Sequence, residues 1–268
     1  MLCGRCEAED AVVRRCKNGV ALCRQCFVDA FEEDVHLTIV QEGFFDNGDT
    51  VTIGVSGGKD SAVLLHTLYV LNKRHNYGLN LLMVAVDEGI VGYRDSSLKS
   101  VYRQQKRYAL PLKVLSYREL FGLSMDEVVS RIGPKNNCTY CGVFRRQALE
   151  RGSVLCNATK LATGHNADDT AETVLMNLLR GDLNRLHRCV RPISALGDGL
   201  PRCKPLYRCY EKEIVLYARI QVSNLAVTLT SCRLDLLSAY YLTLLSVRLS
   251  ASGTETKSSV LYVELRSP

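Results

Sequence analysis

The stretch from Val51 to Leu71, VTIGVSGGKDSAVLLHTLYVL, constrains the fold of this chain more than any other segment. A β-branched run, Val51–Val55, leads into a pair of glycines, and a longer apolar segment, Ser61–Lys73, follows. Short β-branched runs favour strands, whereas the second segment has the length of a helix. A helix that starts directly after such a turn has backbone N–H groups free to bind an anion such as phosphate. The stretch therefore predicts an anion site between two buried elements.

The residues that follow continue the alternation of strand and helix. The predicted strands are Asn80–Val86, Leu112–Ser116 and Lys160–Thr163, and the predicted helices are Asp95–Tyr108, Gly142–Arg151 and Ala167–Arg180, with Asn166 as the N-cap of the last. This alternation favours an α/β fold in which a parallel sheet carries helices on both faces. Ligands of such folds bind beyond the carboxyl ends of the strands, where the glycine pair lies.

The composition is that of a globular protein with room for one large domain and a small appendage. The chain has 268 residues, of which 47% are hydrophobic and 23% charged. A net charge of +6 permits a nucleic-acid partner but does not require one. No run reaches the roughly 20 apolar residues of a membrane helix, and the opening residues MLCGRCEAED lack the features of a secretory signal. We therefore expect a cytoplasmic protein without a membrane partner.

The 12 cysteines include three Cys-x-x-Cys pairs. In a cytoplasmic protein such pairs indicate metal or redox sites, because disulfides are rare there. Two pairs, Cys3 with Cys6 and Cys23 with Cys26, have the spacing of a four-cysteine zinc ribbon. Binding of Zn²⁺ contributes about 10–16 kcal/mol to the folding of such small modules. We predict a zinc ribbon over residues 1–30.

The changes in pattern along the chain predict four segments. The zinc ribbon is followed by a connecting helix and turn over residues 31–49, in which the helix is expected at Asp29–Glu42. The α/β domain then occupies residues 50–218. Residues 219–268 form a Leu- and Ser-rich tail of unknown structure, which contains no motif that indicates a function.

The hexapeptide SGGKDS supplies each group that an anion site needs. Its glycines allow close backbone approach, its serines offer hydroxyl donors, and its lysine adds charge to the partial positive charge of the helix start. The candidate ligand-binding residues are Ser56, Gly57, Gly58, Lys59, Asp60 and Ser61. Because Lys59 is followed by Asp60, the motif is not a Walker A loop; an acidic residue there suggests a bound Mg²⁺ or an oriented donor. A solvated turn without a ligand is the simpler alternative.

SGGKDS resembles the PP-loop of the N-type ATP pyrophosphatases, which cleave ATP to AMP and pyrophosphate while adenylating a substrate oxygen. The resemblance implies an adenine nucleotide α-hydrolase-like fold in which this loop holds the pyrophosphate portion of ATP. Two more stretches are similar to that family, VAVDEG and TGHNADD. They imply that nucleotide or Mg²⁺ is bound by Asp87, Gly164, His165, Asp168 and Asp169. Simple helix capping is the alternative for the last two aspartates.

The third cysteine pair, Cys138 and Cys141, precedes the predicted basic helix Gly142–Arg151. Two thiolates beside arginines can carry sulfur or ligate an iron–sulfur cluster, and half of a zinc site is the simpler alternative. NNCTYCGVFRRQALE, VDEGIVGYRD and GHNADDTAETVLMNLLRGD together resemble the tRNA 2-thiolation enzymes, and most of all the cytosolic tRNA 2-thiouridine synthetases.

This resemblance implies an ATP-dependent tRNA sulfurtransferase. The enzyme would adenylate the C2 oxygen of the wobble uridine, position 34, and sulfur would then displace AMP to give 2-thiouridine. The catalytic residues implied are Lys59, Asp60, Cys138, Cys141 and Asp168. The partners implied are tRNA, a second subunit of the cytosolic thiolation complex and a ubiquitin-like sulfur carrier.

The cofactors implied are ATP, Mg²⁺ and Zn²⁺, with a three-cysteine 4Fe–4S cluster or direct sulfur transfer at the Cys138/Cys141 pair. The third cluster ligand is not identified, because the family's third cysteine lies in a segment that the tail replaces here. The candidates to take its place, in a different sequence context, are Cys203, Cys209 and Cys232.

Two other functions stay open at this point. The chain is either another PP-loop enzyme that adenylates tRNA, of the 2-thiocytidine or lysidine type, or a zinc-ribbon scaffold that binds tRNA without catalysis, since its C-terminal region is atypical. Basic side chains that form a candidate tRNA surface are Arg14, Arg15, Lys17, those of Lys99–Arg107, Arg145, Arg146, Arg151, Arg180 and Arg185. We expect His165 at the site and His66 as a packed or surface residue.

Overall fold

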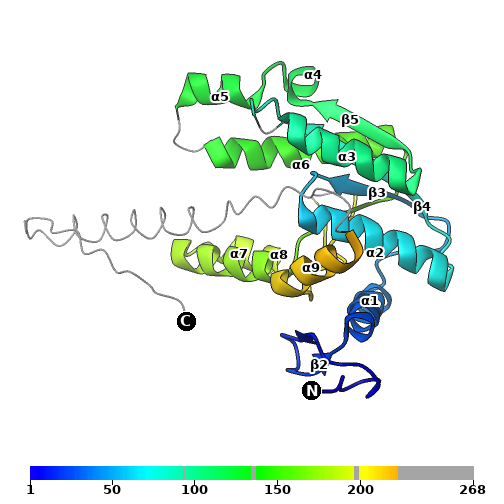
Figure 1. Ribbon diagram of the computed structural model, residues 1–268. Helices are drawn as coiled ribbons and strands as arrows, with labels where there is room; N and C mark the ends of the chain where they lie inside the picture. Colours follow the sequence, from blue (N-terminus) through cyan, green and yellow to red (C-terminus); the bar gives the residue numbers. More distant parts are fainter. Residues whose placement is uncertain (93, 134–136, 196–198, 223–268) are drawn as a thin grey trace, which may run out of the picture. The chain divides into compact units, whose positions relative to one another are not determined.

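The computed structural model describes residues 1–222 except 93, 134–136 and 196–198 (Figure 1). Most of the predicted tail therefore lies outside the described residues, and the part of it that is described belongs to the π-helix Ala218–Val222. The described residues belong to one compact unit.

A six-stranded sheet forms the centre of this unit, with the strand order β5-β4-β3-β6-β8-β7. All neighbours are parallel except β7, which is antiparallel to β8. The strands are β3 (Thr50–Val55), β4 (Asn80–Asp87), β5 (Leu112–Ser116), β6 (Lys160–Ala162), β7 (Ile193–Ser194) and β8 (Arg202–Cys203). In the central pair, Val55 of β3 lies beside Ala85 of β4. The carboxyl ends of both strands therefore lie at the same end of the sheet.

Helices cover both faces of the sheet, as predicted. Side chains alternate along β3, so Thr52 and Gly54 face α6 (Asn137–Leu155), where Thr52 donates to Ser153 Oγ at 2.6 Å. The opposite face packs against α2 (Lys59–His75) and α3 (Arg94–Tyr108) (Figure 1). The remaining helices are α4 (Tyr117–Phe121), α5 (Met125–Ile132), α7 (Ala167–Arg180), α8 (Leu183–Cys189) and α9 (Glu211–Tyr217).

The α6 helix starts earlier than predicted. The sequence indicated a helix over Gly142–Arg151, but α6 begins at Asn137, so that the Cys138/Cys141 pair lies within its first turns. Gly142 lowers helix propensity by about 1 kcal/mol but does not end the helix, because the long segment behind it packs on β4 and β5.

The amino-terminal residues form a small antiparallel hairpin followed by the long helix α1 (Arg24–Gln41). The hairpin strands are β1 (Val13–Arg14) and β2 (Ala21–Leu22). The helix begins earlier than the predicted Asp29, because Cys23 is its N-cap and accepts a hydrogen bond from Cys26 N. Phe31 of α1 stacks on Tyr217 of α9 with ring centroids 4.5 Å apart. One hydrophobic core thus contains side chains from the cysteine module and from the sheet layer.

None of the described helices is both long and apolar enough to cross a lipid bilayer.

Candidate functional site

The SGGKDS loop joins β3 to α2 and is closed by its own serines. Ser61 Oγ accepts a hydrogen bond from Ser56 N at 3.1 Å and donates to Gly58 O at 3.1 Å. The two hydroxyls lie 3.2 Å apart. Gly58 is the N-cap of α2 and has no side chain to cap the helix, so the first N–H groups of the helix have no side-chain oxygen from the cap. This is the geometry that suits an anion at a helix start.

Two serines of α3 hold the loop from the other side. Ser97 Oγ donates to Ser56 O at 2.7 Å, and Ser100 Oγ donates to Gly57 O at 3.3 Å. Gly57 has φ of +76°, and a Cβ there would lie 2.7 Å from Ser97 O. Only glycine combines this conformation with so close an approach. The loop is therefore fixed by backbone contacts that a side chain at Gly57 would break.

The lysine of the loop pairs with two carboxylates. Lys59 Nζ is 3.2 Å from Asp60 Oδ2 and 2.7 Å from Glu211 Oε1 at the start of α9. A raised pKa of Glu172 on α7 reports the same crowding, because burial and the nearby Glu211 and Asp168 carboxylates all disfavour its charge. Carboxylate oxygens are the ligands that Mg²⁺ prefers, but among the described residues these carboxylates do not converge as a set of three ligand atoms.

The TGHNADD segment packs directly against the loop. A Cβ on Gly164 would lie 3.0 Å from the backbone C and O atoms of Asp60, so the two segments touch through their main chains. Asn166 caps α7 and also donates from Nδ2 to Asp60 Oδ1 at 3.2 Å. His165 Nδ1 lies 2.9 Å from Thr163 Oγ1. The structure therefore brings Asp60 and the second predicted motif together.

The two aspartates of this motif have different surroundings. Asp169 completes a capping box, in which its carboxylate accepts from Asn166 N at 3.0 Å. Asp168 Oδ2 accepts from Glu211 N at 2.6 Å and so ties α7 to the start of α9. Asp169 thus takes part in capping, whereas Asp168 contacts the backbone of Glu211, whose carboxylate pairs with Lys59.

The end of β4 carries two buried carboxylates. Asp87 accepts from Gly89 N at 3.0 Å and pairs with Arg94 Nε at 2.7 Å. Glu88 pairs with Arg145 Nη2 of α6 at 2.9 Å. Because Ala85 of β4 pairs with Val55 of β3, these carboxylates lie beyond the carboxyl ends of the strands, as the SGGKDS loop does.

The thiol of Cys141 also lies near the carboxyl ends of these strands. Arg145 Nη2 is 3.6 Å from Cys141 Sγ, and the hydroxyl of Tyr117, which directly follows β5, is 3.9 Å from it. Burial opposes the charge of Arg145, yet its pKa is raised overall by the neighbouring Glu88 and Cys141 groups. Burial raises the pKa of Tyr117, and the Cys141 thiol adds to this effect. The side chain of Cys138 lies outside the described residues.

The SGGKDS loop and the Cys141 thiol lie at the same end of the sheet. Cys141 contacts Tyr117, which follows β5, and Arg145 of α6, which in turn pairs with Glu88 after β4; the loop follows β3. Neighbouring strands lie about 4.8 Å apart, so β3 and β5, with β4 between them, are about 10 Å apart across the sheet.

The four amino-terminal cysteines converge. The sulfur atoms of Cys3, Cys6, Cys23 and Cys26 all lie within 4.8 Å of one another, and Cys6 Sγ is 3.9 Å from Cys23 Sγ. Tetrahedral Zn²⁺ with Zn–S bonds of about 2.3 Å has sulfur–sulfur edges of about 3.8 Å. The donor set and its spacing therefore fit a structural zinc ion.

The cysteines considered as a third cluster ligand lie elsewhere. Cys203 and Cys209 are buried in the main core, and burial raises the pKa of each thiol to about 12. Cys141 instead packs against a separate cluster around Tyr117 and Phe144. Cys232 lies outside the described residues.

Three charged residues of the site were not found from the sequence. Glu88, Arg94 and Glu211 all act through contacts between distant segments, and each looks like an ordinary surface residue in its local context. The one available signal was position, because Glu88 directly follows Asp87 at the end of a predicted strand. His66, by contrast, is packed as expected, with Nδ1 2.9 Å from Tyr108 OH.

Comparison with known proteins identifies the family. A profile described as a PP-loop domain matches residues 30–226. This chain belongs to the PP-loop family. Membership confirms the predicted fold class and supports ATP as the nucleotide of the PP-loop at Ser56–Ser61.

The cytoplasmic tRNA 2-thiolation protein 1 of Danio rerio is 60% identical to this PP-loop protein over 218 residues, 81% of this chain and 64% of the relative. Its counterpart in Arabidopsis thaliana is 55% identical over 217 residues, with coverage of 81% and 61%. The chain thus spans a little less than two thirds of these relatives, and the predicted resemblance is confirmed.

A solved structure is similar as well. The U34-tRNA thiolase NcsA from Methanococcus maripaludis, solved with its 4Fe–4S cluster, matches with a TM-score of 0.73 and 30% sequence identity. The match covers 87% of this chain and 75% of that chain.

Proposed function

We propose that this chain is the catalytic PP-loop subunit of a cytoplasmic, ATP-dependent tRNA 2-thiolation enzyme that acts on uridine 34. The observation that carries the proposal is the chain of contacts from Cys141 through Arg145 to Glu88. These contacts hold the Cys141 thiol at the end of the sheet where the PP-loop lies. The named relatives are tRNA thiolation proteins, and the described part of this chain has the groups that such a reaction needs.

The reaction needs an activated leaving group, because the C2 oxygen of uracil leaves poorly. Transfer of AMP from ATP to this oxygen forms a C–O–P linkage and releases pyrophosphate, and sulfur then attacks C2 and expels AMP. The loop N–H groups and Lys59 are suited to hold the negative charge that builds on pyrophosphate. Asp60 and Asp168 would hold Mg²⁺, which screens the same charge when bound. Asp87, Gly164 and His165 complete the proposed nucleotide pocket.

The sulfur side of the reaction is assigned to the pair on α6. Arg145 Nη2 lies 3.6 Å from Cys141 Sγ and orients this sulfur, the atom through which cysteine acts as a nucleophile or ligand. We propose that a ubiquitin-like carrier supplies sulfur at the sulfide level, and that this pair either holds a cluster like that of the Methanococcus maripaludis thiolase or positions the carrier's sulfur for direct attack on C2 with loss of AMP. Within the pair, Cys141 is the residue whose side chain the structure describes.

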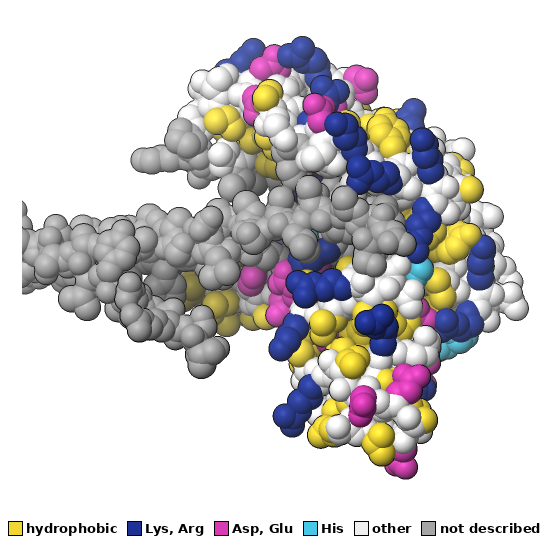
Figure 2. Space-filling view, viewed as in Figure 1, with side chains coloured by type: hydrophobic (Ala, Val, Ile, Leu, Met, Phe, Trp, Pro, Cys, Tyr) yellow, Lys and Arg dark blue, Asp and Glu magenta, His cyan; other side chains and the backbone are white. Residues whose placement is uncertain are grey.

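The outer face of α3 suits the phosphate backbone of tRNA. Figure 2 shows Lys and Arg side chains gathered over the region of this helix. Lys99, Arg103 and Lys106 recur at helical spacing and are exposed, whereas Ser97 and Ser100 on the inner face hold the PP-loop. A polyanion that follows the outer face is thereby led toward the loop. A second subunit of the thiolation complex would complete the tRNA-binding surface.

A reconstitution assay tests the proposed function. Purified protein is incubated with ATP, Mg²⁺, a sulfide donor and unmodified tRNA, and both 2-thiouridine and AMP are measured. We expect both products, and we expect Cys141→Ser to abolish 2-thiouridine. AMP formation without thiolation would contradict the sulfur assignment and favour another adenylating tRNA enzyme of the family. tRNA binding without either product would favour the scaffold alternative.

A further inference from the structure

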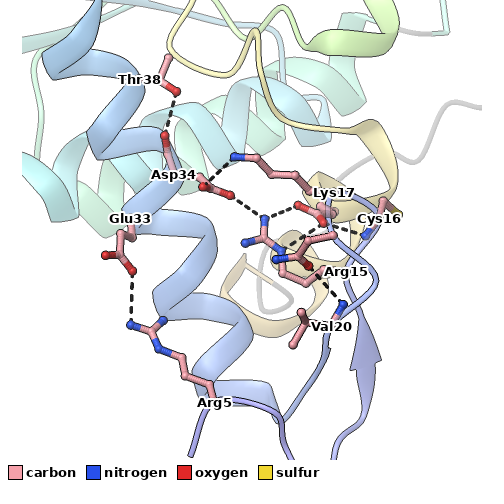
Figure 3. Close-up of polar contacts among 10 residues, drawn as sticks. Arg5, Arg15, Cys16, Lys17, Val20, Glu33, Asp34 and Thr38 are labelled. Atoms are coloured by element: carbon pink, nitrogen blue, oxygen red, sulfur yellow. Dashed lines mark hydrogen bonds and ion pairs between the residues drawn. The ribbon is translucent and has the colours of Figure 1, made fainter.

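A buried arginine connects the cysteine module to α9. Arg15 follows β1 and is almost fully buried, and Figure 3 shows its guanidinium reaching Asp34 of α1, 2.8 Å away. The same guanidinium binds Glu213 of α9 through two hydrogen bonds, at 3.2 Å and 2.7 Å. Glu213 is 2% exposed and also accepts from Cys16 N at 3.0 Å. The module therefore holds one side chain of α9 by three hydrogen bonds.

The same short helix holds the PP-loop lysine. Glu211 lies two residues before Glu213, and its carboxylate is 2.7 Å from Lys59 Nζ. Residues two apart on a helix point to different sides, so α9 presents one carboxylate to the module and the other to the loop. Asp168 binds Glu211 N, which fixes the start of α9 from the α7 side. At its other end, Tyr217 donates to Glu32 of α1 at 2.6 Å.

Stability alone is a weak reason for such a buried ion pair. Burying two charges costs several kcal/mol each, and apolar side chains of similar size often serve stability as well or better. A bidentate arginine–carboxylate pair instead fixes direction and register. Here the register that it fixes is that of α9, whose first residue contacts Lys59.

We propose that Arg15 is a positioning residue for the PP-loop, which acts through α9 to place Glu211 against Lys59. The cysteine module then influences the ATP site indirectly, because it contacts α9 and α9 contacts the loop. This inference deepens the proposed function and rests on it only where the loop is said to bind ATP. The physical coupling exists in the protein without nucleotide.

Hydrogen exchange of the full chain tests the coupling without any ligand. Arg15→Lys keeps the charge but loses the bidentate geometry. We expect peptides from α9 and from the PP-loop at residues 56–62 to exchange at least about threefold faster in this variant. Arg5→Gln is the matched control, because Arg5 pairs with Glu33 of α1 at 3.3 Å, an exposed contact that does not involve α9. It should leave loop exchange unchanged.

The same substitution in a Glu211→Gln variant distinguishes positioning through Glu211 from a general destabilisation of the fold. In Glu211→Gln the link between α9 and Lys59 is weakened, so adding Arg15→Lys should speed exchange in α9 but no longer in the loop. Equal loop effects in both backgrounds, or no loop effect of Arg15→Lys at all, would overturn the proposal.

Affinity for ATP, measured by calorimetry, supplies a further readout. It should fall about fivefold in Arg15→Lys and be unaffected by Arg5→Gln. A wild-type chain that binds no ATP would defeat the proposed function, while the exchange data would still decide the inference.

Discussion

At the scale of single residues, the structure explains why an aspartate follows the lysine in SGGKDS. Asp60 accepts from Asn166 Nδ2 with one oxygen and pairs with Lys59 with the other. It therefore joins the PP-loop to the TGHNADD segment, whose Gly164 touches its backbone. An acidic side chain beside a phosphate site is tolerated because its charge is already shared between a lysine and an amide.

Arg145 and its neighbour Arg146 provide a paired test at this scale. Arg145 contacts Cys141 Sγ and Glu88, whereas Arg146 is exposed and contributes its backbone carbonyl to Arg202. We expect Arg145→Gln to lower the rate of 2-thiouridine formation about 10- to 100-fold, because Cys141 Sγ loses the neighbouring guanidinium that links it to Glu88. Arg146→Gln should reduce the rate less than about threefold. Similar losses in both variants would mean that their shared role is tRNA binding.

His66 is expected to make the protein sensitive to acid. Burial, and then the positive charge of Arg107, lower the pKa of His66 from 6.5 to about 4. Between these values the unfolded chain binds more protons than the folded one, so the free energy of unfolding falls as pH decreases. The loss from this one residue is on the order of 3 kcal/mol by pH 4.

Urea unfolding at pH 7, 6 and 5 measures this effect. The curve of stability against pH should be flatter in His66→Gln than in the wild type. Parallel curves for the two proteins would rule out His66 as the source.

At the scale of secondary-structure elements, periodicity located four strands of the sheet but neither the two-residue strands β7 and β8 nor the contacts between helices. The predicted strand Val51–Val55 and the helix that follows it are present, because local β-branched and apolar patterns determine them. The early start of α6 and the role of α9 were missed. The seven residues of α9 are too few to show a period, and their function depends on Arg15, 198 residues away from Glu213.

We expect the two faces of α3 to have separable functions. Replacing Lys99, Arg103 and Lys106 by glutamine should weaken tRNA binding and reduce the dependence of log affinity on log salt by about one unit for each tRNA phosphate that is no longer neutralised. Affinity for ATP should not change, because Ser97 and Ser100 on the inner face remain. Filter binding over a salt series measures the slope. An unchanged slope would place the tRNA on another surface.

At the scale of the whole molecule, the sequence predicts a zinc ribbon separate from the α/β domain. In the structure the two parts share one hydrophobic core. The cysteine spacing predicted a self-contained module, and the four sulfurs do converge. Yet Cys3, Phe27 and Phe31 lie in one continuous core with Leu64 of α2 and Tyr217 of α9. Composition could not reveal this, because a zinc module and a packed subdomain have similar local sequences.

This shared core determines what loss of the metal should do. We propose that Zn²⁺ binds Cys3, Cys6, Cys23 and Cys26, and a bound metal stabilises the folded chain by mass action. Because the module and the sheet layer share one core, a chelator should lower the melting temperature of the entire chain by about 10 °C in a single transition. Calorimetry together with metal analysis measures both quantities.

The control for metal loss is Cys16→Ser, since Cys16 is exposed and is not one of the four converging cysteines. This variant should keep its zinc and its melting temperature, whereas Cys23→Ser should lose both. If the chelator instead produced a separate low-temperature transition and left the main one in place, the module would fold independently. The contacts of Arg15 and Phe31 with α9 would then contribute little to the stability of the α/β part. A single transition means that the metal, α9 and the PP-loop form one cooperative unit.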